Sequence, residues 1–183
     1  SVLIIHQPLS PRYSSKKWEQ HLYSRLVVDL VGSGYKVLFK PHPRVISNGA
    51  LEQLRQNINS SLDNKKMIDY IARDVIAEDL LSRCSALITP ISVTAYTSLR
   101  MGIPTIFVRT PRIVNKLLVD MHELSEIHYL SDPSNIVTAI DNILKDNNSR
   151  ELWFKKGPQA AKKLSGSSED FNTLWSKCVE ELI

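Results

Sequence analysis

The chain has few cysteines and no long apolar run, and each shortage excludes a class of protein. Cys84 and Cys178 stand far apart and form no CxxC pair, so neither a zinc motif nor a dithiol redox motif is present, and two free thiols suit a reducing cytosol. The apolar runs are too short to cross a bilayer. The opening SVLII lacks the basic segment and the length of a signal peptide.

A strong charge of either sign is also missing. The formal net charge is +4 and the calculated isoelectric point is near 9.1. Such a mild excess suits an anionic small ligand or a contact with a membrane surface, and it falls short of the electrostatic footprint of a nucleic-acid-binding protein. We therefore expect no nucleic-acid partner.

Several sequence motifs that announce known chemistries are absent. The stretch VGSGYK (31–36) has two glycines, but it follows a helical pattern and precedes a strand, so we interpret it as a helix stop and not as a dinucleotide loop. There is no Walker motif, and ISVTA (91–95) is not the G-x-S-x-G turn of a hydrolase. No pair of carboxylates has a convincing metal-ligand spacing. We expect no metal site and no cofactor other than a substrate.

What the chain does contain is an alternation of short apolar runs and helical patterns. The predicted strands are residues 2–5, 36–39, 66–72, 85–89, 103–108 and 127–130. Helical patterns separate them and follow them, at 14–34, 48–58, 77–84, 94–102, 113–124 and 132–146, with two more helices before Ile183. The strands are apolar throughout, so both of their faces must be covered. The sequence predicts one α/β domain over residues 1–183, a Rossmann-like doubly wound parallel sheet of about six strands with helices on both faces.

Such sheets bind ligands at the carboxyl ends of their strands. The predicted candidates there are Gln7 after the first strand, Lys40, His42 and Arg44 after the second, Arg73 and Asp74 after the third, and Ser92 and Thr94 after the fourth. This edge is rich in cations and hydroxyl groups, so it suits an anion such as a phosphate.

Two of these segments have an alternative, purely structural interpretation. In VLFKPHPRV (37–45), Pro41 and Pro43 stiffen the loop around His42, which either places an imidazole for a ligand or only reverses the chain. At the start of the helix at 94–102, Ser92 and Thr94 either form an anion cradle or provide ordinary N-capping, which needs only one of them.

These motifs, in this order, resemble a known family. QP (7–8), KPHP (40–43) and the hydroxyl-rich turn before GIPTIFV (102–108) resemble the C-terminal, nucleotide-binding half of a GT-B glycosyltransferase. The resemblance extends from residue 2 to about 145. It is nearest to the bacterial capsule and lipopolysaccharide enzymes that use CMP-activated acidic sugars, the Kdo, sialyl- and polysialyltransferases.

The resemblance implies roles for the candidate residues. His42 would contact the donor phosphate and assist catalysis, within the field of Lys40 and Arg44. Ser92 and Thr94 would bind the same phosphate, and Gln7 would lie beside the donor. Cytosine would lie near Arg73 to Glu78, with Glu78 as a ribose contact. Many nucleotide-sugar enzymes have a glutamate where this chain has Thr97, which disfavours a UDP-hexose donor.

The resemblance also implies partners and leaves alternatives open. The partners would be a nucleotide-sugar, a glycan acceptor and an N-terminal acceptor domain of the same protein, which we expect because the chain starts at Ser1 and enters a strand at once. The expected location is the cytoplasm, with a peripheral contact at the inner face of the membrane. The alternatives are a CDP-glycerol glycerophosphotransferase and a nucleotide-binding module without activity.

Overall fold

The computed structural model describes residues 1–7, 16–42, 49–62, 65–72, 74–90, 92–108, 128–130 and 132–165. Three sequence predictions lie outside these ranges: the helix at 113–124, the last helix before Ile183, and the positions of Arg44 and Arg73.

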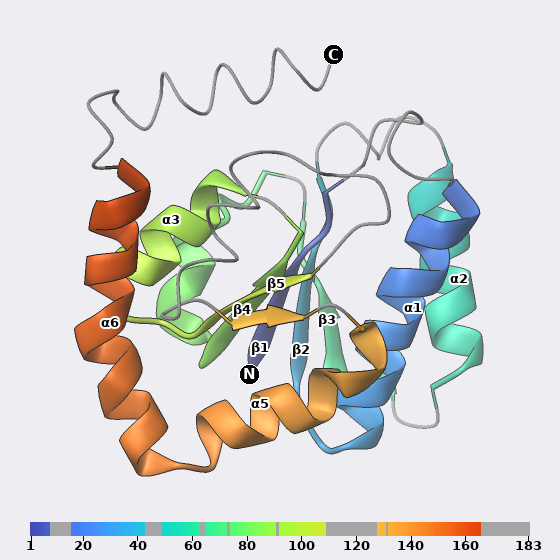
Figure 1. Cartoon of the computed structure of the whole chain (residues 1–183). Coiled ribbons are helices and arrows are strands. Elements are labelled where there is room, and N and C mark those ends of the chain that lie inside the picture. The colour runs from blue at the N-terminus through green and yellow to red at the C-terminus, as the bar shows by residue number, and fades with distance from the viewer. Residues whose placement is uncertain are drawn as a thin grey trace.

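The described residues form one parallel sheet (Figure 1). Its strands are β1 (Val2–Ile5), β2 (Val37–Lys40), β3 (Ile68–Tyr70), β4 (Ala86–Thr89), β5 (Thr105–Val108) and the short edge strand β6 (His128–Leu130). They lie in the order β3-β2-β1-β4-β5-β6, and every neighbouring pair is parallel. The prediction of a Rossmann-like α/β fold is confirmed. The strand order reverses between β1 and β4, which is where such folds place a ligand crevice.

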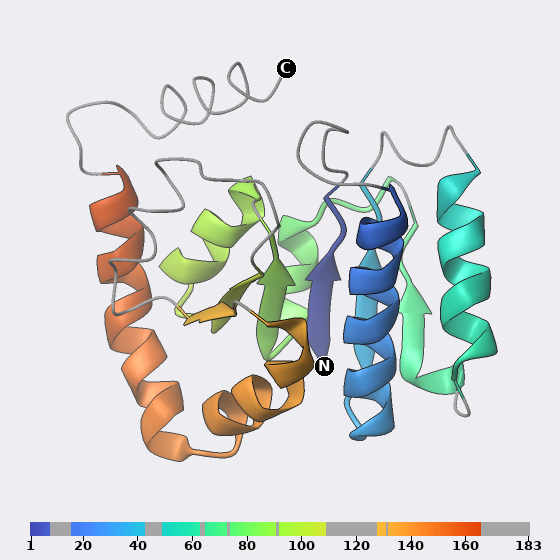
Figure 2. The same cartoon turned by 45° about the vertical axis from the view of Figure 1, so that its right-hand side comes forward.

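Helices cover both faces of the sheet (Figure 2). They are α1 (Lys16–Gly32), α2 (Ala50–Ser60), α3 (Val93–Arg100), α5 (Ile136–Leu144) and α6 (Asn147–Ser165), with the 3-10 helices η2 (Lys65–Met67), η3 (Glu78–Arg83) and η4 (Pro133–Asn135). The helices α1 and α2 pack together on one face, and α5 also contacts α1. On the other side of the sheet, α3 contacts both η3 and α6. None of the helices in the described ranges combines the length and the apolar composition that a membrane crossing requires.

The apolar strands form the core, as their sequence predicts. Every residue of β1, β2, β4 and β5 is buried, because helices cover the sheet on both sides. Leu26 and Leu30 of α1 are fully buried, and Trp153 of α6 is 8% exposed.

Two predicted elements differ in detail from the structure. The predicted strand at 66–72 is reduced to Ile68–Tyr70, because η2 precedes it and β3 pairs only with three residues of β2. The predicted helix at 77–84 is the 3-10 helix η3. The prediction that VGSGYK stops a helix is confirmed: α1 ends at Gly32, and Gly34 has a φ of 85°.

The backbones of α3 and α6 meet at a glycine contact. A Cβ atom on Gly157 would lie 2.6 Å from the carbonyl oxygen of Leu99 and 3.3 Å from the Cα of Gly102. Only a residue without a side chain lets α6 approach the end of α3 this closely. This contact helps to fix α3, whose opposite end lies at the carboxyl edge of the sheet.

Candidate functional site

The loops that hold the predicted site residues leave the sheet at one edge. Because β2, β1 and β4 are parallel neighbours, the segments that follow them all emerge at their carboxyl ends. His42 follows β2, Gln7 follows β1 and Ser92 follows β4. With adjacent strands about 4.8 Å apart, the β2 and β4 exits are separated by roughly 10 Å, with the β1 exit between them. The prediction that these loops share an edge is confirmed, and a common binding pocket stays a prediction.

The β2 exit places a lysine and a histidine at this edge. Lys40 is the last residue of β2 and is 5% exposed, and its carbonyl oxygen accepts a hydrogen bond from the His6 amide at 2.9 Å. Burial lowers the pKa of Lys40, and the charge of Asp74 opposes that shift. Pro41 is buried and His42 is half-buried. The buried proline anchors the start of the segment that holds the imidazole.

The β4 exit opens α3 and is tied to η3. Ser92 is the N-cap residue of α3, and its Oγ accepts a hydrogen bond from the Thr94 amide at 3.2 Å. The Thr94 hydroxyl donates to Oε1 of Glu78, the first residue of η3, at 2.7 Å. Three predicted site residues, from the β3–β4 and β4–β5 connections, are therefore joined in one hydrogen-bonded group.

The direction of these bonds determines what each group can offer a ligand. Thr94 uses its single hydroxyl hydrogen on Glu78, whereas the hydroxyl hydrogen of Ser92 takes no part in the capping bond. The Glu78 carboxylate lies beside the N-terminus of α3, where a negative charge is favoured. A second anion here would be repelled by Glu78, whereas hydroxyl groups could donate to it.

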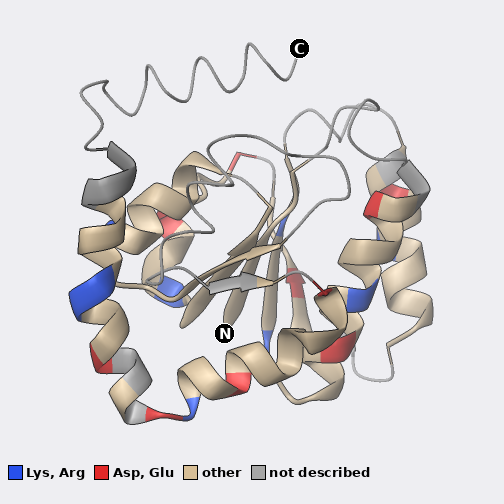
Figure 3. Ribbon diagram, viewed as in Figure 1, with Lys and Arg blue, Asp and Glu red and all other residues tan. Residues whose placement is uncertain are grey.

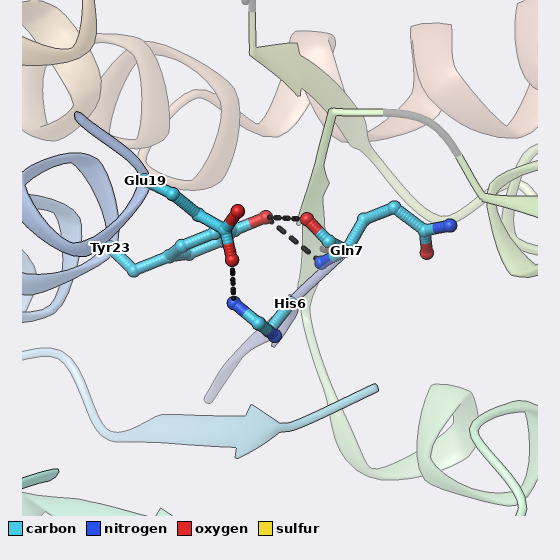
Figure 4. A network of polar contacts seen from close by, with 4 residues as sticks. All are labelled: His6, Gln7, Glu19 and Tyr23. Atoms are coloured by element: carbon cyan, nitrogen blue, oxygen red, sulfur yellow. Dashed lines mark hydrogen bonds and ion pairs between the residues drawn. The ribbon is translucent and has the colours of Figure 1, made fainter. Parts of the chain in front are cut away.

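A polar cluster at the β1 exit was not predicted from the sequence (Figure 4). It consists of His6 and Gln7 after β1, and Glu19 and Tyr23 on α1. Nε2 of His6 lies 2.7 Å from Oε1 of Glu19. The backbone amide of Gln7 donates to the Tyr23 hydroxyl at 3.0 Å, and that hydroxyl donates to the backbone carbonyl oxygen of Gln7 at 3.4 Å. Burial raises the pKa of Tyr23, so the hydroxyl stays protonated and able to donate.

A signal for this cluster exists in the sequence. Glu19 and Tyr23 are four residues apart in a helical pattern, so they lie on one face of α1. His6 directly follows a fully apolar strand, where a polar side chain must find a partner or reach solvent. Which face of the helix meets the strand exit, however, is set by tertiary packing.

Basic and acidic residues are interspersed along the described helices (Figure 3). In Figure 3, basic and acidic residues alternate along the helices and do not gather over one element. Within the described ranges, no group of three His, Cys, Asp or Glu residues is arranged to hold a metal ion.

Comparison with known proteins identifies a family. The family model for alpha-2,8-polysialyltransferase matches residues 1–99, which run from β1 into α3 and include all three strand exits described above. Among solved structures, KpsC of Thermosulfurimonas dismutans, a beta Kdo 2,4 transferase, is similar with a TM-score of 0.46 and 16% sequence identity. That alignment covers 87% of this chain and 43% of the KpsC chain, so the chain spans less than half of that protein. No curated protein sequence matches the chain.

Proposed function

Because the chain belongs to the alpha-2,8-polysialyltransferase family, we propose that it is the donor-binding part of a capsule glycosyltransferase that uses a CMP-activated acidic sugar. The observation that carries this proposal is the family match over residues 1–99, which contains Gln7, Lys40, His42 and Ser92, all at one edge of the sheet.

The proposed chemistry is stabilisation of the leaving group. An acceptor hydroxyl attacks the anomeric carbon of the donor, the bond from that carbon to the phosphate oxygen breaks, and its electron pair stays on CMP. Negative charge grows on the phosphate, and a hydrogen bond from His42 together with the field of Lys40 would stabilise it. The base that takes the acceptor proton would come from another part of the protein. Removing one such donor typically raises the barrier by about 2.7–4 kcal/mol.

The β4 exit would bind the nucleoside end of the donor. Glu78 is a hydrogen-bond acceptor, and its bond from Thr94 orients it beside α3. Ribose presents hydroxyl groups that can donate hydrogen bonds to a carboxylate, whereas an ionised phosphate only accepts them. The Glu78 carboxylate is therefore better suited to ribose than to phosphate. Ser92 could still donate its hydroxyl hydrogen toward the phosphate. The direction of the Thr94 bond supports this division of roles.

The proposal also includes the remaining partners. The acceptor would be a glycan, and an acceptor-binding domain would complete the enzyme, with the whole at the inner face of the membrane. Arg44 and Arg73 would add positive charge to the donor site.

The experiment is calorimetric titration of the chain with CMP. We expect wild-type protein to bind and the affinity of His42→Ala to fall by tenfold or more, about 1.4 kcal/mol. His21→Ala is the matched control, since His21 is an exposed residue on α1. Unchanged affinity in His42→Ala, or no binding by wild-type protein, would refute the proposed site.

A panel of donors discriminates the alternatives. CMP-Kdo, CMP-sialic acid and CDP-glycerol are offered to the full-length protein, and product is measured for each. Transfer from CDP-glycerol alone would replace the proposal with a glycerophosphotransferase. Nucleotide binding without transfer from any donor would indicate a module without activity.

A further inference from the structure

We propose that Tyr23, together with the His6–Glu19 pair, is a positioning residue. It fixes Gln7 at the point where the strand order reverses between β1 and β4, and it thereby sets the affinity for the nucleotide. This inference rests on the proposed function, because it concerns the same edge of the sheet. Tyr23 itself would not touch the ligand.

The first step is the pair of hydrogen bonds between the Tyr23 hydroxyl and the backbone of Gln7. The Tyr23 hydroxyl accepts from the Gln7 amide at 3.0 Å and donates to the Gln7 carbonyl oxygen at 3.4 Å. Both backbone polar groups of Gln7 are therefore directed at the same atom on α1. In Figure 4 the side-chain amide of Gln7 points away from this cluster. The two hydrogen bonds to Tyr23 involve only the Gln7 backbone, so the Gln7 side-chain amide is available to a ligand.

The second step is the rigid position of the Tyr23 ring, which carries the hydroxyl group. Tyr23 is 1% exposed and fully packed in the core. Its ring lies edge-on to His6 at a centroid distance of 4.5 Å and edge-on to Phe39 of β2 at 6.0 Å. A ring enclosed in this way has one available rotamer, so the hydroxyl has a fixed position.

The third step is the histidine that precedes Gln7. His6 is 1% exposed, and its Nε2 bonds to Glu19, one helical turn before Tyr23. Its backbone amide bonds to the Lys40 carbonyl oxygen at 2.9 Å. The end of β1 is thus fixed to α1 by two side chains and to β2 by the sheet. Nδ1 of His6 is buried and has no hydrogen-bond partner in the described ranges, so within them Nε2 makes the hydrogen bond that orients the ring.

The competing explanation is that this cluster only stabilises the packing of α1 on the sheet. Tyr35 provides the control, because its hydroxyl also bonds to a residue distant in sequence, Asp141 of α5. Tyr35 precedes β2 and therefore lies at the amino edge of the sheet, opposite to the candidate site. Both Tyr→Phe substitutions remove one hydroxyl group and keep the ring.

The test is CMP affinity in Tyr23→Phe, Tyr35→Phe and Gln7→Ala, with folding checked by thermal unfolding. We expect Tyr23→Phe to weaken CMP binding about fivefold to tenfold, as the loss of a positioned hydrogen bond would, while Tyr35→Phe lowers only stability. In the Gln7→Ala background, Tyr23→Phe should have no further effect, because its action passes through Gln7. Glu19→Gln keeps the size of the side chain that bonds to His6, and it should weaken CMP binding less than Tyr23→Phe does.

The outcomes separate the two proposals. If wild-type protein fails to bind CMP, the proposed function is refuted and this inference with it. If wild-type protein binds and Tyr23→Phe binds equally well, or the effects of Tyr23→Phe and Gln7→Ala simply add, the positioning role alone is refuted.

Hydrogen exchange gives a readout that does not depend on the ligand. The Gln7 amide should be protected in wild-type protein and lose protection in Tyr23→Phe, while core amides stay protected. Equal protection of Gln7 in both proteins would show that Tyr23 does not hold this residue, and would overturn the inference.

Discussion

Replacing Gly157 by alanine tests how α6 fixes α3 beside the candidate site. The added methyl carbon would lie 2.6 Å from the Leu99 carbonyl oxygen and 3.3 Å from the Gly102 Cα. Both are backbone atoms, so no rotamer change can relieve the contact. The helices must instead move apart.

The magnitude follows from two opposing terms. Forcing an extra carbon into a packed contact typically costs about 1–3 kcal/mol. Replacing a helical glycine by alanine gains about 0.5–1 kcal/mol. The central values leave a net loss of about 1 kcal/mol in the free energy of unfolding, with an upper limit of about 2.5 kcal/mol. For a domain of this size, a loss of about 1 kcal/mol lowers the melting temperature by roughly 2–4 °C.

Thermal unfolding followed by circular dichroism measures this loss, and Gly32→Ala is the matched control. Gly32 is likewise a helical glycine, the last residue of α1, yet a Cβ there would have no atom within 4 Å, and its φ is not positive. We expect Gly32→Ala to be neutral or stabilising by up to about 1 kcal/mol. A melting temperature of Gly157→Ala equal to or above that of wild type would refute the close contact between α3 and α6.

Three further predictions concern single polar groups. Thr94→Val should reduce the free energy of unfolding by about 1 kcal/mol, because it removes the hydrogen bond to Glu78. Urea denaturation measures this loss, with Thr97→Val as the control. Equal stability of the two variants would contradict the bond. The bonds from Lys145 and Tyr35 lower the pKa of Asp141, so its contribution to stability is present above the unfolded value near 3.8 and is lost as the pH falls through the lower folded value. The melting temperatures of wild type and Asp141→Asn should therefore differ at pH 7 and converge once the pH has fallen below the folded pKa of Asp141, and a difference that persists in acid would contradict this. Burial raises the pKa of Cys84 to about 11, so in a Cys178→Ser background iodoacetamide at pH 8 should label the folded protein slowly and the unfolded protein fast, whereas equal rates would contradict the burial.

The sequence was sufficient to predict the fold because the strands carry a local signal. Runs such as VLII and ALIT are apolar on both faces, which only a sheet covered on both sides can bury. Parallel strands then place every following loop at one edge. The positions of Gln7, His42 and Ser92 at that edge were therefore predictable without coordinates.

The pairing of side chains within the site was not predictable in the same way. Thr94 donates to Glu78 because η3 is placed beside the start of α3, which depends on how the β3–β4 connection crosses the sheet. The sequence interpretation instead directed Thr94 at a phosphate, a role that awaits the binding experiments.

The chain's own residues thus determined a parallel α/β sheet, the edge that holds the candidate site and the residue types found there. Only the tertiary structure decided that β1 lies between β2 and β4, and that Tyr23 of α1 holds the backbone of Gln7. The physical reason is that apolar periodicity is a local property of the chain. The partner of a polar group depends instead on the rotation and depth at which each helix packs on the sheet, and packing of the whole core sets both.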